Sequence, residues 1–234
     1  GSTTWKFAPD SCCDCVIRSN SSGVVSPPCT VFARSAMGRF GSAARCSTAL
    51  SSSAVGISAT GAASEEAAAL GAWLVHYSTD YVFDGNGTRP YLDSDPTGPL
   101  SAYGQSKLAG EDAIRASGAQ HLILRTAWVY ATRGGNFLRT MLRLGAEREE
   151  LRVVADQHGS PTPAWLLADA AARVLGQGIA ESGVRHLVAG GQTTWHGFAE
   201  AIFDEAQARG LIERKPRVLP IGTADYPTPA RRPP

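Results

Sequence analysis

The chain has 234 residues, of which 43% are hydrophobic and 18% are charged, and its formal net charge is +1. These values are typical of one substantial globular domain, with or without a small appendage, and exclude a fibrous or wholly disordered chain. A charge so close to zero provides no basic field for nucleic acid or an anionic membrane. No apolar run approaches the length of a membrane-spanning helix, and no secretory signal is visible at the N-terminus. We therefore expect a cytoplasmic protein without nucleic-acid or membrane partners.

The first quarter of the chain differs in composition from the rest. Residues 1–62 hold all five cysteines and 13 of the 21 serines, but only two of the 21 acidic residues. The cysteines lack the paired spacing of a zinc site and have no histidine nearby, so we expect no metal. We predict an atypical, low-complexity segment over residues 1–62, which is either poorly ordered or a replaced half of the α/β domain, and a functional region over residues 63–230. A shifted reading frame upstream of about residue 60 is one hypothesis that explains the contrast.

From residue 62 onward, the apolar pattern predicts alternating helices and strands. We expect helices over residues 64–70, 102–117, 136–148, 164–176 and 194–208, the first with Ser64 as its N-cap. We expect short apolar strands over residues 72–77, 121–125, 151–154 and 186–188. This alternation predicts an α/β fold with a mainly parallel sheet.

Polar residues directly follow the first apolar strand. In parallel sheets, ligands bind at the carboxyl ends of the strands, so the segments just after Tyr77 and Arg125 are candidates for a site. Ser78, Thr79 and Asp80 lie there, and a hydroxyl at a strand end can hydrogen-bond a substrate carbonyl. The plainer explanation is a turn or helix cap, which these residue types also favour.

Tyr103 and Lys107 form the sharpest motif in the sequence. At a spacing of four residues on a helix, the two side chains share one face. An ammonium beside a phenol favours the phenolate, so the pair predicts a lowered pKa for Tyr103 and a better proton donor. By itself, however, such a pair is more often a solvent-exposed feature of a helix surface.

These motifs occur together in a known family. The segments HYSTDYVFDG (76–85) and PLSAYGQSKLAGE (99–111) resemble the extended short-chain dehydrogenase/reductases and, within them, the dTDP-4-dehydrorhamnose reductases. Further similarity covers residues 124–130, 135–142, 156–162, 186–190, 194–195 and 226–229. The resemblance implies a Rossmann-like, mainly parallel sheet with a small C-terminal substrate lobe.

The resemblance also implies a reaction and a site. The chain would reduce dTDP-4-dehydro-6-deoxy-L-mannose to dTDP-L-rhamnose with NADPH or NADH. Tyr103 would give a proton to the C4 oxygen, Lys107 would hold the nicotinamide ribose, and Thr79 would position the ketone. The residues expected to bind the cofactor are Ser78, Tyr103, Lys107 and Thr126. Those expected to bind the nucleotide sugar are Asp80, Tyr81, Trp128, Asn136, Phe137 and Gln157.

The first quarter of the chain departs from the family pattern. The family opens with a strand and a G-x-x-G-x-x-G turn that holds the dinucleotide pyrophosphate, whereas Gly38 and Gly41 form only a weak pair here. We therefore expect an atypical or incomplete cofactor-binding half, and both NADPH and NADH stay open. Three interpretations stay open: a reductase, a non-catalytic regulatory subunit like that of methionine adenosyltransferase, and an inactive fragment of the reductase. A homodimer is one possible assembly of the reductase.

Overall fold

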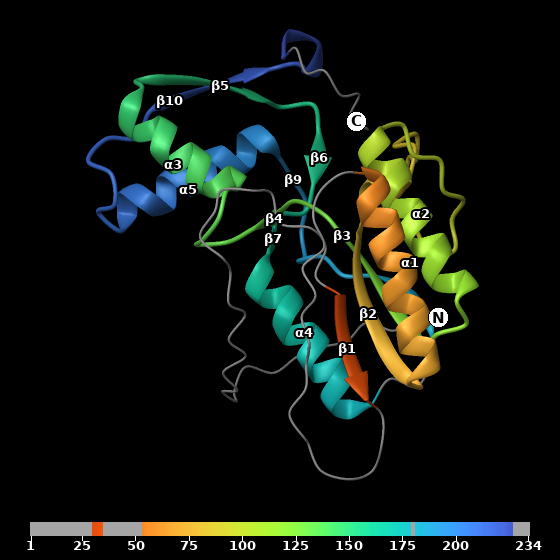
Figure 1. The fold of residues 1–234 in the computed structure, drawn as a ribbon. Coiled ribbons are helices and arrows are strands. Elements are labelled where there is room, and N and C mark those ends of the chain that lie inside the picture. Colours follow the sequence, from red (N-terminus) through yellow and green to blue (C-terminus); the bar gives the residue numbers. More distant parts are fainter. Residues whose placement is uncertain (1–29, 35–52, 179–180, 227–234) are drawn as a thin grey trace.

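The protein is built around a four-stranded, mainly parallel sheet (Figure 1). A computed structural model describes residues 30–34, 53–178 and 181–226, with side chains from residue 60 onward. The sheet has the order β1 (Thr30–Arg34), β2 (Ala72–Thr79), β3 (His121–Thr126) and β8 (Gly183–His186). Strands β2, β3 and β8 run parallel, and β1 pairs antiparallel with β2. The α/β prediction is confirmed.

Helices cover both faces of this sheet. Helices α1 (Ser53–Ala69) and α2 (Ala102–Ala116) lie on one face, and α4 (Ala164–Gln177) lies on the other (Figure 1). Side chains alternate along a strand, so β2 sends Leu74 toward Ile114 of α2 and sends Val75 toward Ala171 of α4. Both faces of β2 are therefore buried, which explains its nearly continuous apolar sequence.

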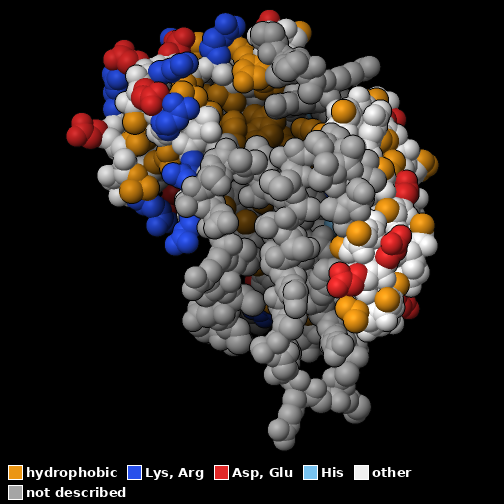
Figure 2. All heavy atoms as spheres, in the orientation of Figure 1, with side chains coloured by type: hydrophobic (Ala, Val, Ile, Leu, Met, Phe, Trp, Pro, Cys, Tyr) orange, Lys and Arg blue, Asp and Glu red, His pale blue; other side chains and the backbone are white. Residues whose placement is uncertain are grey.

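A second lobe contains helices α3 (Phe137–Glu147) and α5 (Trp195–Ala208) and the parallel strands β5 (Glu150–Val154) and β10 (Arg217–Ile221). Its core surrounds Phe203, which is fully buried against Met141, Leu151 and Val218. Figure 2 shows charged side chains of both signs on the outside of this lobe and a recessed group of hydrophobic side chains beside it.

Short elements connect the sheet to the second lobe. The 3₁₀ helix η1 (Asp80–Val82) follows β2 directly, and η2 (Thr223–Asp225) follows β10. Strand β4 (Val129–Tyr130) pairs with β7 (Thr162–Pro163), and β6 (His158–Gly159) pairs with β9 (Thr193–Thr194). The β4–β7 pair places the segment after β3 beside the start of α4, and the β6–β9 pair places the segment after β5 beside the start of α5.

Several predicted boundaries need correction. Helix α1 begins at Ser53, so Ser64 is not its N-cap; the Ser64 hydroxyl lies inside the helix, where it donates to the Gly61 carbonyl at 2.7 Å. Strand β8 ends at His186, where the predicted strand begins. Strand β10 was not predicted, and it contains Pro220, which is unfavourable inside a sheet. Among the described residues β10 pairs with β5 alone, so the proline lies on an edge strand.

The expected boundary at residue 62 falls inside α1, whose backbone continues on both sides of it. The predictions about the five cysteines, about Gly38 and Gly41, and about a shifted reading frame concern segments that lie largely or wholly outside the described residues. In the part of the chain that the structure describes, no helix is both long and apolar enough to cross a membrane.

Candidate active site

The carboxyl ends of β2 and β3 meet at the centre of the molecule. The two strands are in register there, with Ser78 opposite Arg125 and Thr79 opposite Thr126. The hydroxyl of Thr79 donates to the Asp80 carboxylate at 2.9 Å and accepts from the Tyr81 backbone N–H at 3.2 Å, which caps η1. Thr79 is thus both the predicted cap and a residue of the site.

Helix α2 brings Tyr103 to the same strand ends. Ser101 caps the helix by accepting from the Gly104 N–H, and the Tyr103 and Tyr81 rings meet edge to face at 6.0 Å. The helix can approach η1 this closely because residue 104 is glycine: a Cβ there would collide with the Tyr81 carbonyl oxygen. The Tyr103 side chain remains 55% exposed.

A cavity of about 250 Å³ opens between these residues and the second lobe. We call it the Tyr103 cavity. Both polar and apolar side chains line it. Its lining residues are Ser78, Thr79, Asp80, Tyr81, Tyr103, Thr126, Ala127, Trp128, Val129 and Trp195.

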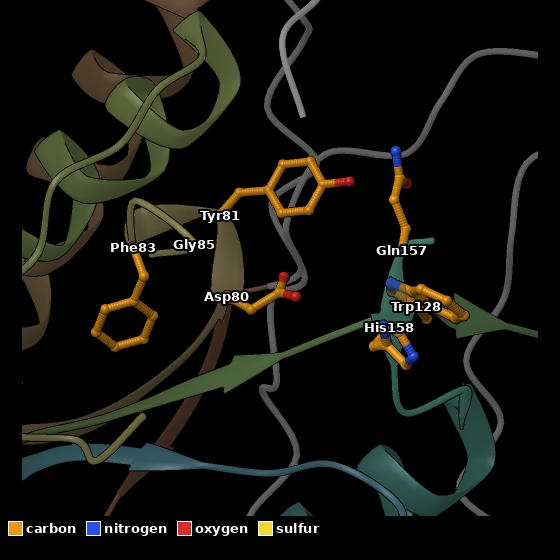
Figure 3. A pocket seen from close by; sticks show the side chains of 7 residues that line it. All are labelled: Asp80, Tyr81, Phe83, Gly85, Trp128, Gln157 and His158. Atoms are coloured by element: carbon orange, nitrogen blue, oxygen red, sulfur yellow. The ribbon is translucent and has the colours of Figure 1, made fainter. Parts of the chain in front are cut away.

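A smaller cavity, which we call the His158 cavity, lies beside it (Figure 3). In Figure 3, the Asp80 carboxylate and the Tyr81 hydroxyl point across it toward Trp128, Gln157 and His158, whereas the Phe83 ring points away. Its lining residues are Asp80, Tyr81, Phe83, Gly85, Trp128, Gln157 and His158. Asp80, Tyr81 and Trp128 therefore border both cavities.

The electrostatics of Tyr103 differ from the prediction. Loss of solvent around the phenol raises its pKa above the ordinary value, a hydrogen bond with Thr79 lowers it in part, and the Asp80 charge raises it further. The predicted lowering by Lys107 is wrong for this structure, because the Lys107 ammonium is engaged elsewhere. Tyr103 is therefore a phenol that keeps its proton at neutral pH.

Lys107 is buried beneath the strand end. Its Nζ donates to the Tyr77 carbonyl at 2.6 Å and lies 3.4 Å from Nε2 of His76, which is itself buried. Burial lowers the pKa of Lys107 to about 8, although nearby Glu111 opposes the shift. Burial and then the Lys107 charge lower the pKa of His76 to about 3, so this imidazole is neutral. Lys107 does not line either of the two cavities.

Asp80 is an acid with an unusual pKa. Burial raises it from 3.8 to about 6, although hydrogen bonds from Thr79 and from the backbone N–H groups of Asp80 and Tyr81 oppose this shift. A carboxyl group of this kind changes charge close to neutrality. It can accept a hydrogen bond from a sugar hydroxyl when ionised and donate one when protonated.

Comparison with known proteins places this geometry in a family. The RmlD substrate binding domain family matches residues 46–234. The chain belongs to this family. Among curated relatives, dTDP-4-dehydrorhamnose reductase of Shigella flexneri is 54% identical over 167 residues, which are 70% of this chain and 56% of that protein. The corresponding enzyme of Burkholderia thailandensis is 51% identical over 175 residues, covering 70% of this chain and 58% of its own length.

Solved structures of RmlD-type proteins share the fold. The dTDP-4-dehydrorhamnose reductase of Bacillus anthracis, solved in complex with NADP, matches with a TM-score of 0.69 and 37% identity. The match covers 74% of this chain and 59% of that one. The chain therefore spans less than two thirds of the length of these relatives.

The structure brings most of the predicted site residues of this RmlD-family chain to the cavities. Asn136 and Phe137 line neither cavity. The Asn136 side chain caps α3 by accepting from the Arg139 N–H and donates to the Ala131 carbonyl at 2.7 Å. The Phe137 ring packs on Phe198. Their predicted contacts with the nucleotide stay predictions.

Ser78 has a structural partner. Its hydroxyl donates at 2.5 Å to the fully buried Glu111, which is paired with the buried Arg125 at 2.7 Å. No local sequence pattern could have indicated this contact, because Ser78 and Glu111 lie on different elements and are 33 residues apart in sequence.

Six cavity residues were not predicted as site residues, and two of them, Trp195 and His158, carry polar ring nitrogens. Both belong to segments with family similarity, but nothing in their local sequence points into a cavity. Their position depends on the β6–β9 pair, which joins His158 to Thr194 across 36 residues of sequence. Among the described residues, no group of three or more His, Cys, Asp or Glu side chains is placed to hold a metal ion.

Proposed function

We propose that this chain carries the catalytic and substrate-binding region, residues 63–230, of a reductase that converts dTDP-4-dehydro-6-deoxy-L-mannose to dTDP-L-rhamnose. The observation that supports this most directly is the Tyr103 cavity. A protonated phenol, the Thr79 hydroxyl and an aromatic wall meet there at the ends of two parallel strands. The relatives of Shigella flexneri and Burkholderia thailandensis are dTDP-4-dehydrorhamnose reductases.

One feature of the Tyr103 cavity supports binding of the nicotinamide part of NADPH or NADH, namely an unpartnered hydroxyl group in the described part of the chain. The hydroxyl of Thr126 is buried and has no hydrogen-bond partner among the described residues, and Thr126 lines the Tyr103 cavity. A buried hydroxyl without a partner costs free energy, which a ligand amide or hydroxyl would recover. Ser78, Tyr103, Lys107 and Thr126 would hold this group, and when bound it supplies a hydride. The B. anthracis relative was solved with NADP.

The chain's own residues then account for the proton. The raised pKa of Tyr103 keeps the phenol protonated, so it can donate a hydrogen bond to the substrate C4 oxygen and transfer its proton as that oxygen gains charge. Thr79, which lines the same cavity as Tyr103, would orient the ketone. Asp80, Tyr81, Trp128 and Gln157 border the space for the deoxysugar.

A second candidate is binding without turnover, as in a regulatory subunit. The placement of Lys107 favours it, because the ammonium is held by the Tyr77 carbonyl and does not line the Tyr103 cavity. In the reductase, another N–H of the Lys107 ammonium, which has three donors, would have to reach a ribose hydroxyl.

The test is to mix the purified protein with NADPH or NADH and dTDP-4-dehydrorhamnose and to follow the absorbance of the reduced nicotinamide. The proposal expects oxidation matched mole for mole by dTDP-rhamnose, identified by mass spectrometry. Binding of the nucleotide sugar without oxidation would support the regulatory role instead. Failure to bind either compound would support an inactive fragment.

We further propose, from the resemblance, that the protein acts as a homodimer in the cytoplasm, where nucleotide sugars and reduced nicotinamides are made and used. Light scattering of the purified protein tests the first point: a mass twice that of the 24.6 kDa chain is expected.

A further inference from the structure

Trp195 is the first residue of α5, and its side chain reaches from the second lobe into the Tyr103 cavity. The indole stacks on that of Trp128, with ring centroids 3.6 Å apart and planes inclined by only 9°. The two residues are 67 positions apart in sequence, so this contact joins the segment after β3 to the second lobe.

Trp128 needs such support because its backbone is strained. Its φ is +47°, in the left-handed region that bulky side chains rarely adopt. The Thr162 N–H donates to the Trp128 carbonyl at 3.2 Å and holds the backbone. Gly159 lies against the indole so closely that a Cβ at residue 159 would collide with it. Backbone strain of this kind persists where the surroundings fix the conformation.

The Trp195 side chain is held both by a hydrogen bond from its Nε1 and by a ring contact. Its Nε1 donates to Oε1 of Gln157 at 3.2 Å, and Nε2 of Gln157 donates to Thr223 at 3.0 Å. The ring of Phe137 packs against Trp195 with centroids 4.6 Å apart. Gln157 is only 6% exposed, so its amide is not free to exchange this bond readily with solvent. The orientation of Trp195 is therefore set by the second lobe.

The two stacked indoles give the Tyr103 cavity a flat aromatic surface, which we call the aromatic wall. Ala127 and Val129 also line this cavity, together with the polar side chains of Thr79, Asp80 and Tyr103. A 6-deoxyhexose has a methyl group and C–H faces on some sides and hydroxyls on others. Such a sugar can place its C–H surface on aromatic rings and its oxygens toward hydrogen-bonding groups.

We propose that Trp195 is a positioning residue that holds Trp128 as a rigid wall for the deoxysugar ring of a nucleoside-diphosphate 6-deoxyhexose. This inference rests on the proposed function for the class of ligand. Trp195 has no contact with the nucleotide part of the ligand in this proposal. A substitution of Trp195 should therefore weaken only the binding of the sugar.

Calorimetric titration of the full chain with dTDP-L-rhamnose and with dTDP alone tests this assignment. Trp195→Ala removes both the stacking and the bond to Gln157, and we expect it to weaken dTDP-L-rhamnose binding at least about tenfold and dTDP binding less than about twofold. Trp195→Phe keeps a stacked ring, and we expect it to restore the affinity for dTDP-L-rhamnose to within about threefold of the original. Trp165→Ala, at a 70% exposed position on α4, is the matched control and should change neither affinity.

Equal weakening of both ligands by Trp195→Ala, or no weakening of either, would overturn the inference. In turnover, the same variant should raise KM more than it lowers kcat. A wild-type chain that binds dTDP-L-rhamnose no more tightly than dTDP would also overturn it. The protein could also bind dTDP-L-rhamnose with the expected Trp195 effects and yet fail to oxidise NADPH. That result would refute the proposed reductase but would still support the positioning role of Trp195.

Circular dichroism provides a readout that does not depend on activity or on Trp195→Ala folding. Two stacked indoles give an exciton couplet, which should be present in the wild-type chain and lost in both Trp195→Phe and Trp128→Phe. Trp165→Phe should retain it. A wild-type spectrum without the couplet, or a couplet that survives Trp195→Phe, would contradict the stacked arrangement.

Discussion

Asp80 shows how a single side chain combines burial with chemistry. It borders both cavities, accepts a hydrogen bond from Thr79, and has its pKa raised to about 6 by burial. A carboxyl with a raised pKa binds its proton more tightly in the folded chain than in the unfolded chain. Its contribution to stability is therefore greatest when it is protonated and is lost as the pH rises from its ordinary pKa of 3.8 to about 6.

We expect Asp80→Asn to remove this loss. Urea unfolding at about pH 4 and about pH 7 should show that the wild-type chain loses more stability over this interval than the variant does. Asp84→Asn is the control. Hydrogen bonds, chiefly from the Asn86 N–H, lower the pKa of Asp84 from 3.8, so its stabilisation is lost mainly below this interval and the substitution should change the pH dependence within it little. An unchanged pH dependence in Asp80→Asn would contradict the burial of this carboxyl.

At the scale of elements, a buried ion pair joins α2 to the sheet. Glu111 of α2 accepts from Nε and Nη2 of Arg125 on β3, and both side chains are almost wholly buried. Arg125 also lies over the Phe83 ring at 5.0 Å, which ties the loop after η1 to the same pair. The helix that carries Tyr103 is thereby held against the strand ends.

Breaking this pair on one side should destabilise the protein strongly. We expect Glu111→Ala to cost about 3–5 kcal/mol of unfolding free energy, because it leaves the Arg125 charge buried without its main partner. The double variant Glu111→Leu with Arg125→Met should lose much less, since it buries no charge. Chemical denaturation of the three proteins measures this; a single variant no worse than the double would contradict a buried pair.

A second prediction for α2 concerns the close approach at Gly104. Gly104→Ala should lower both stability and turnover, because the new Cβ would push the helix away from the Tyr81 carbonyl and displace Tyr103. Gly176→Ala is the matched control: it is also helical, has open space around it, and should stabilise the protein by up to about 1 kcal/mol. Thermal unfolding and activity assays of the two variants distinguish a local collision from a general effect of alanine.

Sequence patterns predicted the helices and strands that are determined by local sequence. Strand β2 is an apolar run, and α2 was predicted with its start at residue 102 and its end within one residue of the observed one. The meeting of Thr79 with Tyr103 followed from the strand-end rule and the family motifs. Local rules failed for Ser64, which has the chemistry of a cap but lies within a longer helix.

At the scale of the whole molecule, the site depends on contacts that no local pattern contains. Trp195 reaches the cavity only because β6 pairs with β9 and α5 packs on α3. Lys107 has the predicted position on the helix, but its ammonium bonds to the Tyr77 carbonyl, since a buried cation takes the nearest strong acceptor. The spacing of Tyr103 and Lys107 alone could not reveal this partner.

The proposed reduction depends on Tyr103 as the proton donor. The most direct test compares wild type with Tyr103→Phe, which deletes only the phenolic oxygen, in NADPH oxidation with dTDP-4-dehydrorhamnose and in NADPH binding. We predict at least about a 100-fold loss of turnover with NADPH affinity retained within about threefold. Turnover by Tyr103→Phe at the wild-type rate would contradict the account.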